Sequence, residues 1–377
     1  MSTPALHGTP RRPAWAEISR AALLHNLSVV RSLIPSSVKV MAIVKANAYG
    51  HGAVECAKVL RSAGANVLGV AILQEAVELR EAGIDGPIVV LTPPMPEEAA
   101  TYIAHDIAFT LVSRPTANSF SECAFAAGRT ARAHLKIDTG MGRVGIPPAE
   151  AHLFLKDVAT LGNIHVEGIA THFASSDDDL PLTQRQWQSF MHVVEELKNS
   201  GMQFEYVHAA NSGAIMHLPE SAGTCVRPGL MLYGYAPDED HILAPRLKPA
   251  LSLRAQIDFV KRVPEGTGIS YGVRYVTSRE TTIATVPLGY ADGYTRRLTG
   301  KAVALFGGKR VRVAGTVCMD QIMLDVGDMP AHQGDTVTLI GEDGEERITA
   351  WELATATGTI PYEILTGISA RVPRVYV

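Results

Sequence analysis

Eight short apolar runs between about residue 20 and residue 240 limit the folds open to this sequence. They are VKVMAIVK from Val38, NVLGVAI from Asn66, PIVVLT from Pro87, IAFTLV from Ile107, RAHLKIDTG from Arg132, IHVEGIATHF from Ile164, FEYVHAANS from Phe204 and CVRPGLMLYG from Cys225. Amphipathic stretches separate them, with Gly, Pro or Asn at the joints. Most runs are almost continuously apolar, which is typical of parallel strands covered on both faces. The pattern predicts an α/β fold, a (β/α)8 TIM-like barrel, with a doubly wound open sheet as the alternative.

The sequence after about Pro245 follows a different pattern, in which helical spacing is scarce. Its strand-like segments, separated by turn signals, are LSLRAQIDFVKRV, TTIATVPLGY, KAVALFGGKRVRVAGTV, DQIMLDVG and DTVTLIGE. We therefore predict a barrel domain at 14–244 and a C-terminal, mostly-β domain at 245–377. The barrel range begins with a strand-like piece, and we expect its first residues to pair with the β domain. Residues 1–13 are expected to be disordered.

Charge and cysteine usage exclude several classes of protein. The formal net charge of −4 comes from interspersed signs, which disfavours nucleic-acid binding. The first fourteen residues, MSTPALHGTPRRPA, lack an apolar core of signal-peptide length, and no later run is long enough to span a bilayer. The four cysteines are widely separated and form no CxxC spacing, which favours reduced thiols. We therefore predict a cytoplasmic protein without membrane association.

Polar side chains recur where the predicted barrel strands end. They are Lys45 after the first strand; Lys136, Asp138 and Arg143 at the fifth; His172 at the sixth; Asn211 and Ser212 at the seventh; and Arg227 in the eighth. Catalytic residues of such barrels gather at the carboxyl ends of the strands. Each residue alone has an ordinary structural interpretation, but together they predict a cationic mouth that binds an anionic, polar ligand.

Lys45 is the candidate catalytic group in this mouth. A neutral lysine amine forms an imine with a carbonyl compound, and burial beside other cations lowers a lysine pKa. Pyridoxal phosphate fits these requirements, because it brings an aldehyde, a phosphate and a ring nitrogen. Gly213 and Gly229 follow strands seven and eight, where barrels commonly bind phosphate. The thirteen histidines include no HExxH pattern, so no metal site is predicted.

The motifs at these positions resemble those of the alanine racemase family. They are VKANAYGHG around Lys45, HLKIDTGMGRVG from His134, THFASSD from Thr171, HAANSGA from His208, VRPGLMLYG from Val226, GISYG around Tyr271, PLGYADGY around Tyr290 and GTVCMDQIMLDV around Met319. The resemblance extends from Trp15 to the final RVPRVYV, and VKANAYGHG is highly specific.

The resemblance implies a role for each matching residue. Lys45 corresponds to the Schiff-base lysine and Tyr271 to the second catalytic base, contributed across a homodimer interface. The implied cofactor contacts are Tyr49, Ser212, Gly229, Leu230 and Tyr362 at the phosphate, Arg227 at the pyridine nitrogen and His172 beside Arg227. Arg143 and Met319 match residues that address the substrate carboxylate, and Lys136 falls where many members carry a carbamylated lysine. Tyr290, Cys318 and Asp320 are implied pocket residues, although Cys318 fits a small packing role equally well.

The implied activity is that of a pyridoxal-phosphate-dependent isomerase that interconverts L-alanine and D-alanine and supplies D-alanine for peptidoglycan. One base on each face of Cα, Lys45 and Tyr271, meets the chemical need of racemisation. Two other readings remain open at this point. A basic amino-acid decarboxylase on the same plan would place a carboxylate at the pyridine nitrogen, where this sequence has Arg227. A non-catalytic pyridoxal-phosphate carrier would lack the β domain that supplies Tyr271.

Overall fold

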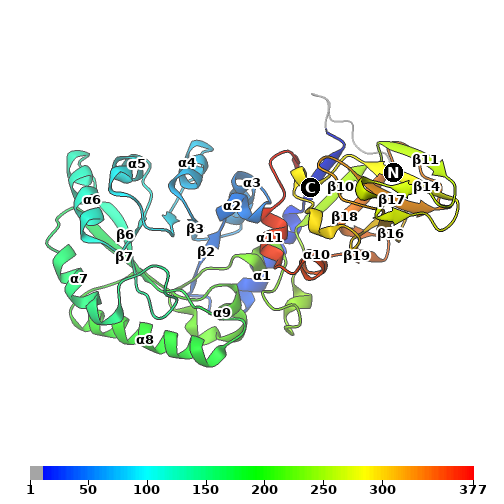
Figure 1. The fold of residues 1–377 in the computed structure, drawn as a ribbon. Coiled ribbons are helices and arrows are strands. Elements are labelled where there is room, and N and C mark those ends of the chain that lie inside the picture. Colours follow the sequence, from blue (N-terminus) through cyan, green and yellow to red (C-terminus); the bar gives the residue numbers. More distant parts are fainter. Residues whose placement is uncertain (1–11) are drawn as a thin grey trace. The chain divides into compact units, whose positions relative to one another are not determined.

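The computed structural model describes residues 12–377, which form two compact units (Figure 1). The barrel unit is Arg20–Ala250, and the β unit combines the described residues up to Ser19 with Leu251–Val377. Of residues 1–13, for which we predicted disorder, residues 1–11 lie outside the described residues. Arg12 donates hydrogen bonds to Asp292, and the carbonyl of Pro13 accepts one from the Gln256 N–H.

The barrel unit contains eight parallel strands, as predicted. They are β2 (Lys39–Ile43), β3 (Val67–Val70), β4 (Ile88–Val90), β5 (Phe109–Leu111), β6 (Ala131–Lys136), β7 (Ile164–Ala170), β8 (Tyr206–His208) and β9 (Cys225–Val226). Two four-stranded sheets, β4-β3-β2-β9 and β5-β6-β7-β8, are joined by a parallel bridge between Val89 and Ala108. A hydrogen bond from the Thr224 N–H to the Val207 carbonyl joins β8 to the start of β9. Because β9 also pairs with β2, the ring of strands is closed, and the open-sheet alternative is wrong.

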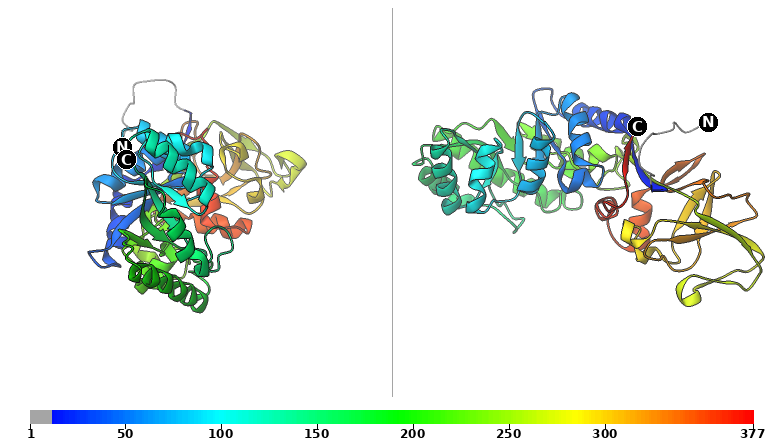
Figure 2. Two further views of the ribbon diagram at one scale, coloured as in Figure 1. Left: turned by 90° about the vertical axis from the view of Figure 1, so that its left-hand side faces the viewer. Right: turned by 90° about the horizontal axis from the view of Figure 1, so that it is seen from above.

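Helices follow the strands and cover the outside of the barrel (Figure 2). They are α1 (Arg20–Ser32), α3 (Ala53–Ser62), α4 (Leu73–Glu81), α5 (Ala99–Ala104), α6 (Arg114–Ala126), α7 (Ala151–Val158), α8 (Leu180–Asn199) and α9 (Ser212–His217). Side-chain caps begin three of them: Ser113, Asp179 and Asn211 each accept a backbone N–H of the first turn. Within residues 12–377, no helix combines the length and apolar character that a bilayer crossing requires.

The β unit is built on a ten-stranded sheet. Its strands are β1 (Ala14–Ile18), β10 (Leu251–Gln256), β11 (Phe259–Val263), β14 (Thr281–Val286), β15 (Val303–Phe306), β16 (Lys309–Val313), β17 (Ile322–Gly327), β18 (Thr336–Asp343), β19 (Glu346–Ile348) and β20 (Arg374–Tyr376). Two short strands, β12 (Gly268–Ile269) and β13 (Tyr275–Val276), pair separately, and the helices are α10 (Ala350–Thr357) and α11 (Pro361–Thr366). β1 pairs antiparallel with β10 and parallel with β20, which brings the start and the end of the described chain into one sheet.

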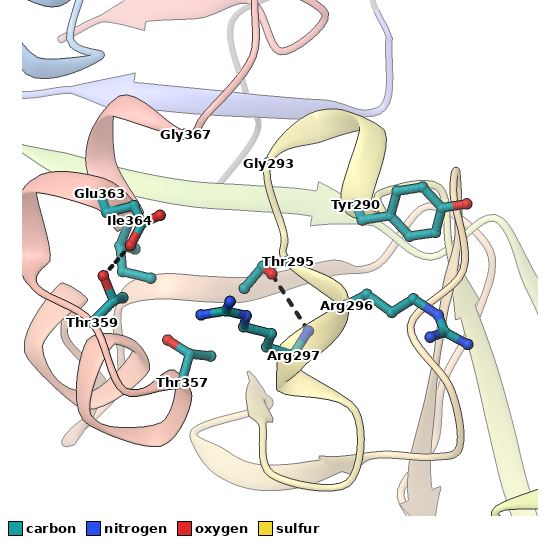
Figure 3. Close-up of a pocket in the computed structure, with 10 residues that line it drawn as sticks. All are labelled: Tyr290, Gly293, Thr295, Arg296, Arg297, Thr357, Thr359, Glu363, Ile364 and Gly367. Atoms are coloured by element: carbon teal, nitrogen blue, oxygen red, sulfur yellow. Dashed lines mark hydrogen bonds between the residues drawn. The ribbon is translucent and has the colours of Figure 1, made fainter.

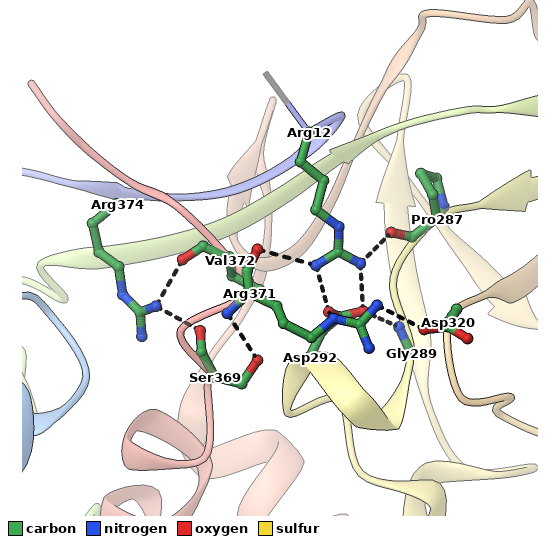
Figure 4. A network of polar contacts seen from close by, with 9 residues as sticks. All are labelled: Arg12, Pro287, Gly289, Asp292, Asp320, Ser369, Arg371, Val372 and Arg374. Atoms are coloured by element: carbon green, nitrogen blue, oxygen red, sulfur yellow. Dashed lines mark hydrogen bonds and ion pairs between the residues drawn. The ribbon is translucent and has the colours of Figure 1, made fainter. Parts of the chain in front are cut away.

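A buried carboxylate, Asp292, organises the polar contacts beside this sheet (Figure 4). Asp292 is 0 % exposed, pairs with Arg12 and Arg371, and accepts the Gly289 N–H at 2.9 Å. Burial disfavours its ionisation, but the Arg12 and Gly289 hydrogen bonds outweigh burial and leave the pKa of Asp292 below its ordinary value. Arg371 also donates to Asp320 at 2.6 Å, so one arginine ties the loop of Asp292 to the loop of Asp320.

Candidate active site

Lys45 lies at the carboxyl end of β2 and opens a turn of left-handed backbone, α2 (Lys45–Tyr49). Residues 46–49 have φ between 51° and 54°, although none of them is glycine. Left-handed backbone costs such residues roughly 1–2 kcal/mol each, so other contacts must hold the turn. The Ala46 N–H donates to Glu75 at 2.5 Å, and the Asn47 side chain accepts the Ala53 N–H at 2.8 Å. The strained turn fixes the lysine at the rim of the barrel.

The charge environment favours the neutral form of the Lys45 amine. Burial lowers its pKa, the charges of Arg143 and Arg227 act in the same direction, and Glu75 opposes them. A lowered pKa raises the fraction of amine that carries a lone pair at neutral pH. Lys45 therefore meets the requirement for a nucleophile and a proton acceptor.

Arg227 lies at the base of the same mouth and is 6 % exposed. Its guanidinium donates to the carbonyls of Thr171, His208 and Ala209. It also contacts two imidazoles, His172 Nδ1 at 3.1 Å and His208 Nδ1 at 2.9 Å. None of the hydrogen bonds that Arg227 makes within residues 12–377 goes to a carboxylate. Burial lowers the pKa of Arg227 to about 10, so the group stays cationic at neutral pH.

His172 is neutral in this environment. Burial, followed by the charges of Arg227 and Lys136, lowers the pKa of His172 well below its ordinary value. Because a guanidinium can only donate, the contact with Arg227 leaves Nδ1 of His172 as an acceptor and places the ring proton on Nε2.

A small cradle of backbone and hydroxyl groups lies between β8, α9 and the segment after β9. The Ser212 hydroxyl accepts the N–H groups of Gly229 and Met231 at 2.9 and 3.3 Å. A Cβ on Gly229 would come within 2.4 Å of the Tyr49 hydroxyl, so only glycine fits there. Leu230 is fully buried and begins a short helical turn. Hydroxyls and a side-chain-free backbone suit a phosphate, and a buried guanidinium without a carboxylate suits a pyridine nitrogen. The residues present therefore fit pyridoxal phosphate.

Lys136 and Asp138 occupy the end of β6, next to Arg143. The Lys136 ammonium donates to the Ile137 carbonyl at 3.3 Å, and burial, with Arg227, lowers its pKa to about 7. Asp138 accepts the N–H groups of residues 140, 141 and 142, which shapes the loop that carries Arg143. Arg143 is exposed. Within residues 12–377, no group of three or more His, Cys, Asp or Glu side chains could hold a metal ion.

Five of the predicted residues lie in the β unit around an open hollow of about 560 Å³. Tyr271, Tyr290, Cys318, Met319 and Asp320 all line it. Tyr271 is 74 % exposed and lies in a strained turn, where Ser270 and Val273 have φ of 65° and 46°. The Thr316 hydroxyl donates to the Tyr271 carbonyl at 2.7 Å, which anchors this turn to the loop before Cys318.

A second pocket of the β unit, of about 390 Å³, shares Tyr290 and Arg296 with this hollow (Figure 3). Figure 3 shows Arg297 directed toward Thr357, whereas Arg296 extends away from it. Tyr362 lies in α11 of the β unit, whereas the other implied phosphate contacts, Tyr49, Ser212, Gly229 and Leu230, lie in the barrel unit.

The sequence reasoning missed several residues that position this site. Glu75 has no motif of its own, and only the structure shows that it accepts the N–H of the residue after Lys45. His208 lies inside HAANSGA but was not singled out, although its imidazole contacts Arg227. Along β6, the polar residues Arg132, His134 and Lys136 alternate with apolar ones, and this alternation is a sequence signal for side chains on one face of the strand.

Comparison with known proteins agrees with this geometry. The family model for the N-terminal domain of alanine racemase matches residues 18–237, and that for the C-terminal domain matches residues 250–376. An alanine racemase of Carboxydothermus hydrogenoformans is 48% identical over 372 residues, which cover 97% of this chain and 100% of that protein. One from Halothermothrix orenii is 45% identical, with 97% of each chain covered.

Solved structures give the same result. The alanine racemase of Streptomyces lavendulae, a producer of D-cycloserine, is 40% identical, with a TM-score of 0.91 and 98% of each chain covered. That of Bacillus anthracis with bound L-Ala-P is 39% identical with a TM-score of 0.91, covering 98% of this chain and 96% of that one. With matched domains across both units and close relatives along its length, the chain belongs to the alanine racemase family.

Proposed function

We propose that this chain interconverts L-alanine and D-alanine with pyridoxal phosphate, using Lys45 and Tyr271 as the two bases. The observation that carries the proposal is the Lys45 amine, whose pKa is lowered among cations at the mouth of the barrel. The proposal includes a cytoplasmic location and a supply of D-alanine for peptidoglycan. The decarboxylase alternative is disfavoured, because that chemistry would need a carboxylate where Arg227 lies.

Each group of the cofactor has residues that would hold it. Tyr49, Ser212, Gly229 and Leu230, with Tyr362 as the contribution of the β unit, would bind the phosphate. Arg227 would face the ring nitrogen, and Lys45 the aldehyde. When bound, pyridoxal phosphate withdraws electrons from Cα of the amino acid and makes its proton acidic.

The residues of the chain then move the proton. The Lys45 amine accepts or returns it on one face of Cα, and the Tyr271 hydroxyl does so on the other. His172, supported by Arg227, is proposed to assist Tyr271. Arg143 and Met319 would orient the substrate carboxylate. Tyr290, Cys318 and Asp320 would line the pocket. Tyr271, Tyr290, Tyr362 and Met319 would restrict its size to suit alanine, with serine as the nearest competitor.

Two copies of the chain are proposed to share their active sites. The exposure of Tyr271 and Met319, 74 % and 52 %, supports a surface that a second copy covers. In this arrangement each site uses Lys45 of one subunit and Tyr271 of the other.

Mixing two inactive variants tests the function and the sharing together. Lys45→Ala and Tyr271→Phe proteins are each expected to be inactive on L-alanine, because each homodimer lacks one base at both sites. After unfolding and joint refolding, half of the dimers are mixed, and each has one intact site. D-alanine formation should therefore return to about a quarter of the wild-type rate.

The controls are each variant refolded alone and the wild-type protein taken through the same steps. An inactive wild-type protein, supplied with pyridoxal phosphate, would contradict the function itself. Wild-type activity without recovery in the mixture would instead place both bases in one subunit.

Lys136 is proposed to carry a carbamate. Its neutral amine adds CO2 with loss of a proton to solvent, which places an anion beside Arg227. Because its pKa is about 7, the amine is largely neutral above pH 7 and protonated below it.

We therefore expect a carbamate signal in 13C NMR of protein equilibrated with 13C-bicarbonate at pH 8.5, and its loss at pH 5.5. Lys136→Gln should remove the signal, while Lys156→Gln, at an exposed lysine, should keep it; a spectrum without the signal at pH 8.5 would disprove the modification.

A further inference from the structure

A chain of hydrogen bonds runs from Arg227 through the interior of the barrel to a carboxylate. Arg227 Nη1 contacts His208 Nδ1 at 2.9 Å, and His208 Nε2 contacts His134 Nδ1 at 2.8 Å. His134 Nε2 then contacts Glu167 Oε1 at 3.2 Å. His134, His208 and Glu167 are each no more than 5 % exposed. The three residues come from the adjacent strands β6, β7 and β8.

The donors and acceptors of this chain allow one arrangement of protons. A guanidinium only donates, so His208 Nδ1 accepts and its proton lies on Nε2. His208 Nε2–H then donates to His134 Nδ1, which leaves the His134 proton on Nε2. The last N–H meets Glu167, whose carboxylate only accepts. Both imidazoles are therefore neutral and carry their proton on Nε2, with every hydrogen bond directed from Arg227 toward Glu167.

The residues around His134 hold its imidazole ring in the orientation that these hydrogen bonds require. A Cβ on Gly168 would come within 2.3 Å of His134 Nδ1, so only glycine at this position leaves room for the ring. Tyr206 stacks on the imidazole with 5.4 Å between ring centroids. The register of β6 and β7 shifts between Ala133 and His134, which places His134 opposite Gly168. The ring is thus confined by one strand neighbour and one aromatic.

Among residues 12–377, one arginine pairs with Glu167: Arg132, at 3.9 Å. Arg132 lies closer to Asp106, at 3.2 Å. A charge buried in a protein interior is ordinarily paired, yet no carboxylate of the described residues accepts a hydrogen bond from Arg227. The relay through two histidines connects the Arg227 guanidinium to a carboxylate that does not touch it.

We propose that Glu167 is a positioning residue for Arg227, acting through His134 and His208. Its carboxylate accepts the last proton of the relay, orients both imidazoles, and polarises His208 as an acceptor for the guanidinium. Arg227 is thereby held in one orientation at the mouth. The proposal rests on the proposed function only where it concerns the pyridine nitrogen; the relay itself is a property of the protein without cofactor.

NMR of the protein without cofactor tests the relay directly. With 15N-labelled histidine, His134 and His208 should both show the proton on Nε2, with strongly deshielded N–H signals. The signals are assigned by their loss in His134→Gln and His208→Gln. A proton on Nδ1 of either ring in the wild-type protein would overturn the proposal without any variant of Glu167.

Glu167→Gln separates the charge of Glu167 from its shape, because the amide oxygen can still accept from His134. We expect the His134 N–H signal to move upfield and the His208 signal to follow by a smaller shift, since hydrogen bonds in a chain polarise one another. Arg132→Gln is the matched control, because it removes the other neighbour of Glu167 and should leave both signals nearly unchanged. Unchanged signals in Glu167→Gln, or equal shifts in the two variants, would refute the relay.

The affinity for pyridoxal phosphate gives the second readout. A weaker hold on Arg227 should raise the dissociation constant of Glu167→Gln about tenfold, because charge-assisted hydrogen bonds are about twice as strong as neutral ones. Arg132→Gln should bind as the wild-type protein does. Equal affinities of Glu167→Gln and the wild type would overturn the positioning role. A wild-type protein that does not bind pyridoxal phosphate would refute the proposed function and leave the proton positions as the test of the relay.

Discussion

Replacing Lys45 by alanine is expected to lower racemisation by at least roughly 10⁴-fold, because the amine acts both as nucleophile and as one of the two bases. The strained turn of α2 holds this amine at the mouth, where Arg143 and Arg227 favour its neutral form. No other lysine in the described part of the chain begins such a turn. The measurement is the rate of D-alanine formation from enantiopure L-alanine, together with the mass of the protein after treatment with pyridoxal phosphate and borohydride.

Lys58→Ala is the matched control, since Lys58 lies on α3 of the same unit and pairs with Glu55 at the surface. It should keep wild-type activity and the mass increase that borohydride produces. Lys45→Ala should show neither. Racemisation by Lys45→Ala within tenfold of the wild-type rate, or a wild-type activity that survives borohydride treatment of the cofactor-loaded protein, would remove Lys45 from the mechanism.

Tyr271→Phe is expected to separate proton exchange from racemisation. Loss of one of two bases should slow conversion in both directions by roughly 10²–10⁴-fold. Lys45 still reaches its own face of Cα, so one enantiomer of alanine should continue to exchange its Cα proton with solvent. NMR in D2O, started separately from L-alanine and D-alanine, measures exchange and conversion in the same sample.

Tyr275→Phe serves as the control for the loss of a hydroxyl in the same region. The Tyr275 hydroxyl donates to Asp325, so its removal should affect the stability of the β unit and leave exchange with both enantiomers intact. If Tyr271→Phe exchanged both enantiomers at wild-type rates, Tyr271 would not be a base. If Tyr271→Phe exchanged the Cα proton of neither enantiomer, proton transfer at the two faces of Cα would not depend on two separate bases.

Much of the fold follows from local patterns in the sequence. Apolar runs that are covered on both faces indicate parallel strands whatever their neighbours are, so all eight barrel strands could be predicted. Most strands of the β unit could be predicted as well, whereas the short strands β12, β13, β19 and β20 lie outside the predicted segments. Lys45, His172 and Arg227 could be placed at the same rim, because parallel strands end on one side of a barrel. The family and its chemistry followed from motifs of contiguous residues such as VKANAYGHG.

The remaining features depend on contacts between residues far apart in the chain. Residues 46–49 adopt left-handed backbone against their own preference, because contacts with Glu75 and Ala53 hold the turn. Closure of the barrel required the register of β2 against β9. The relay from Arg227 to Glu167 joins residues of three further strands. Local sequence encodes which residues are apolar and where strands end. Backbone strain and the direction of hydrogen bonds arise only when distant segments meet, because both depend on partner residues that the local sequence does not contain.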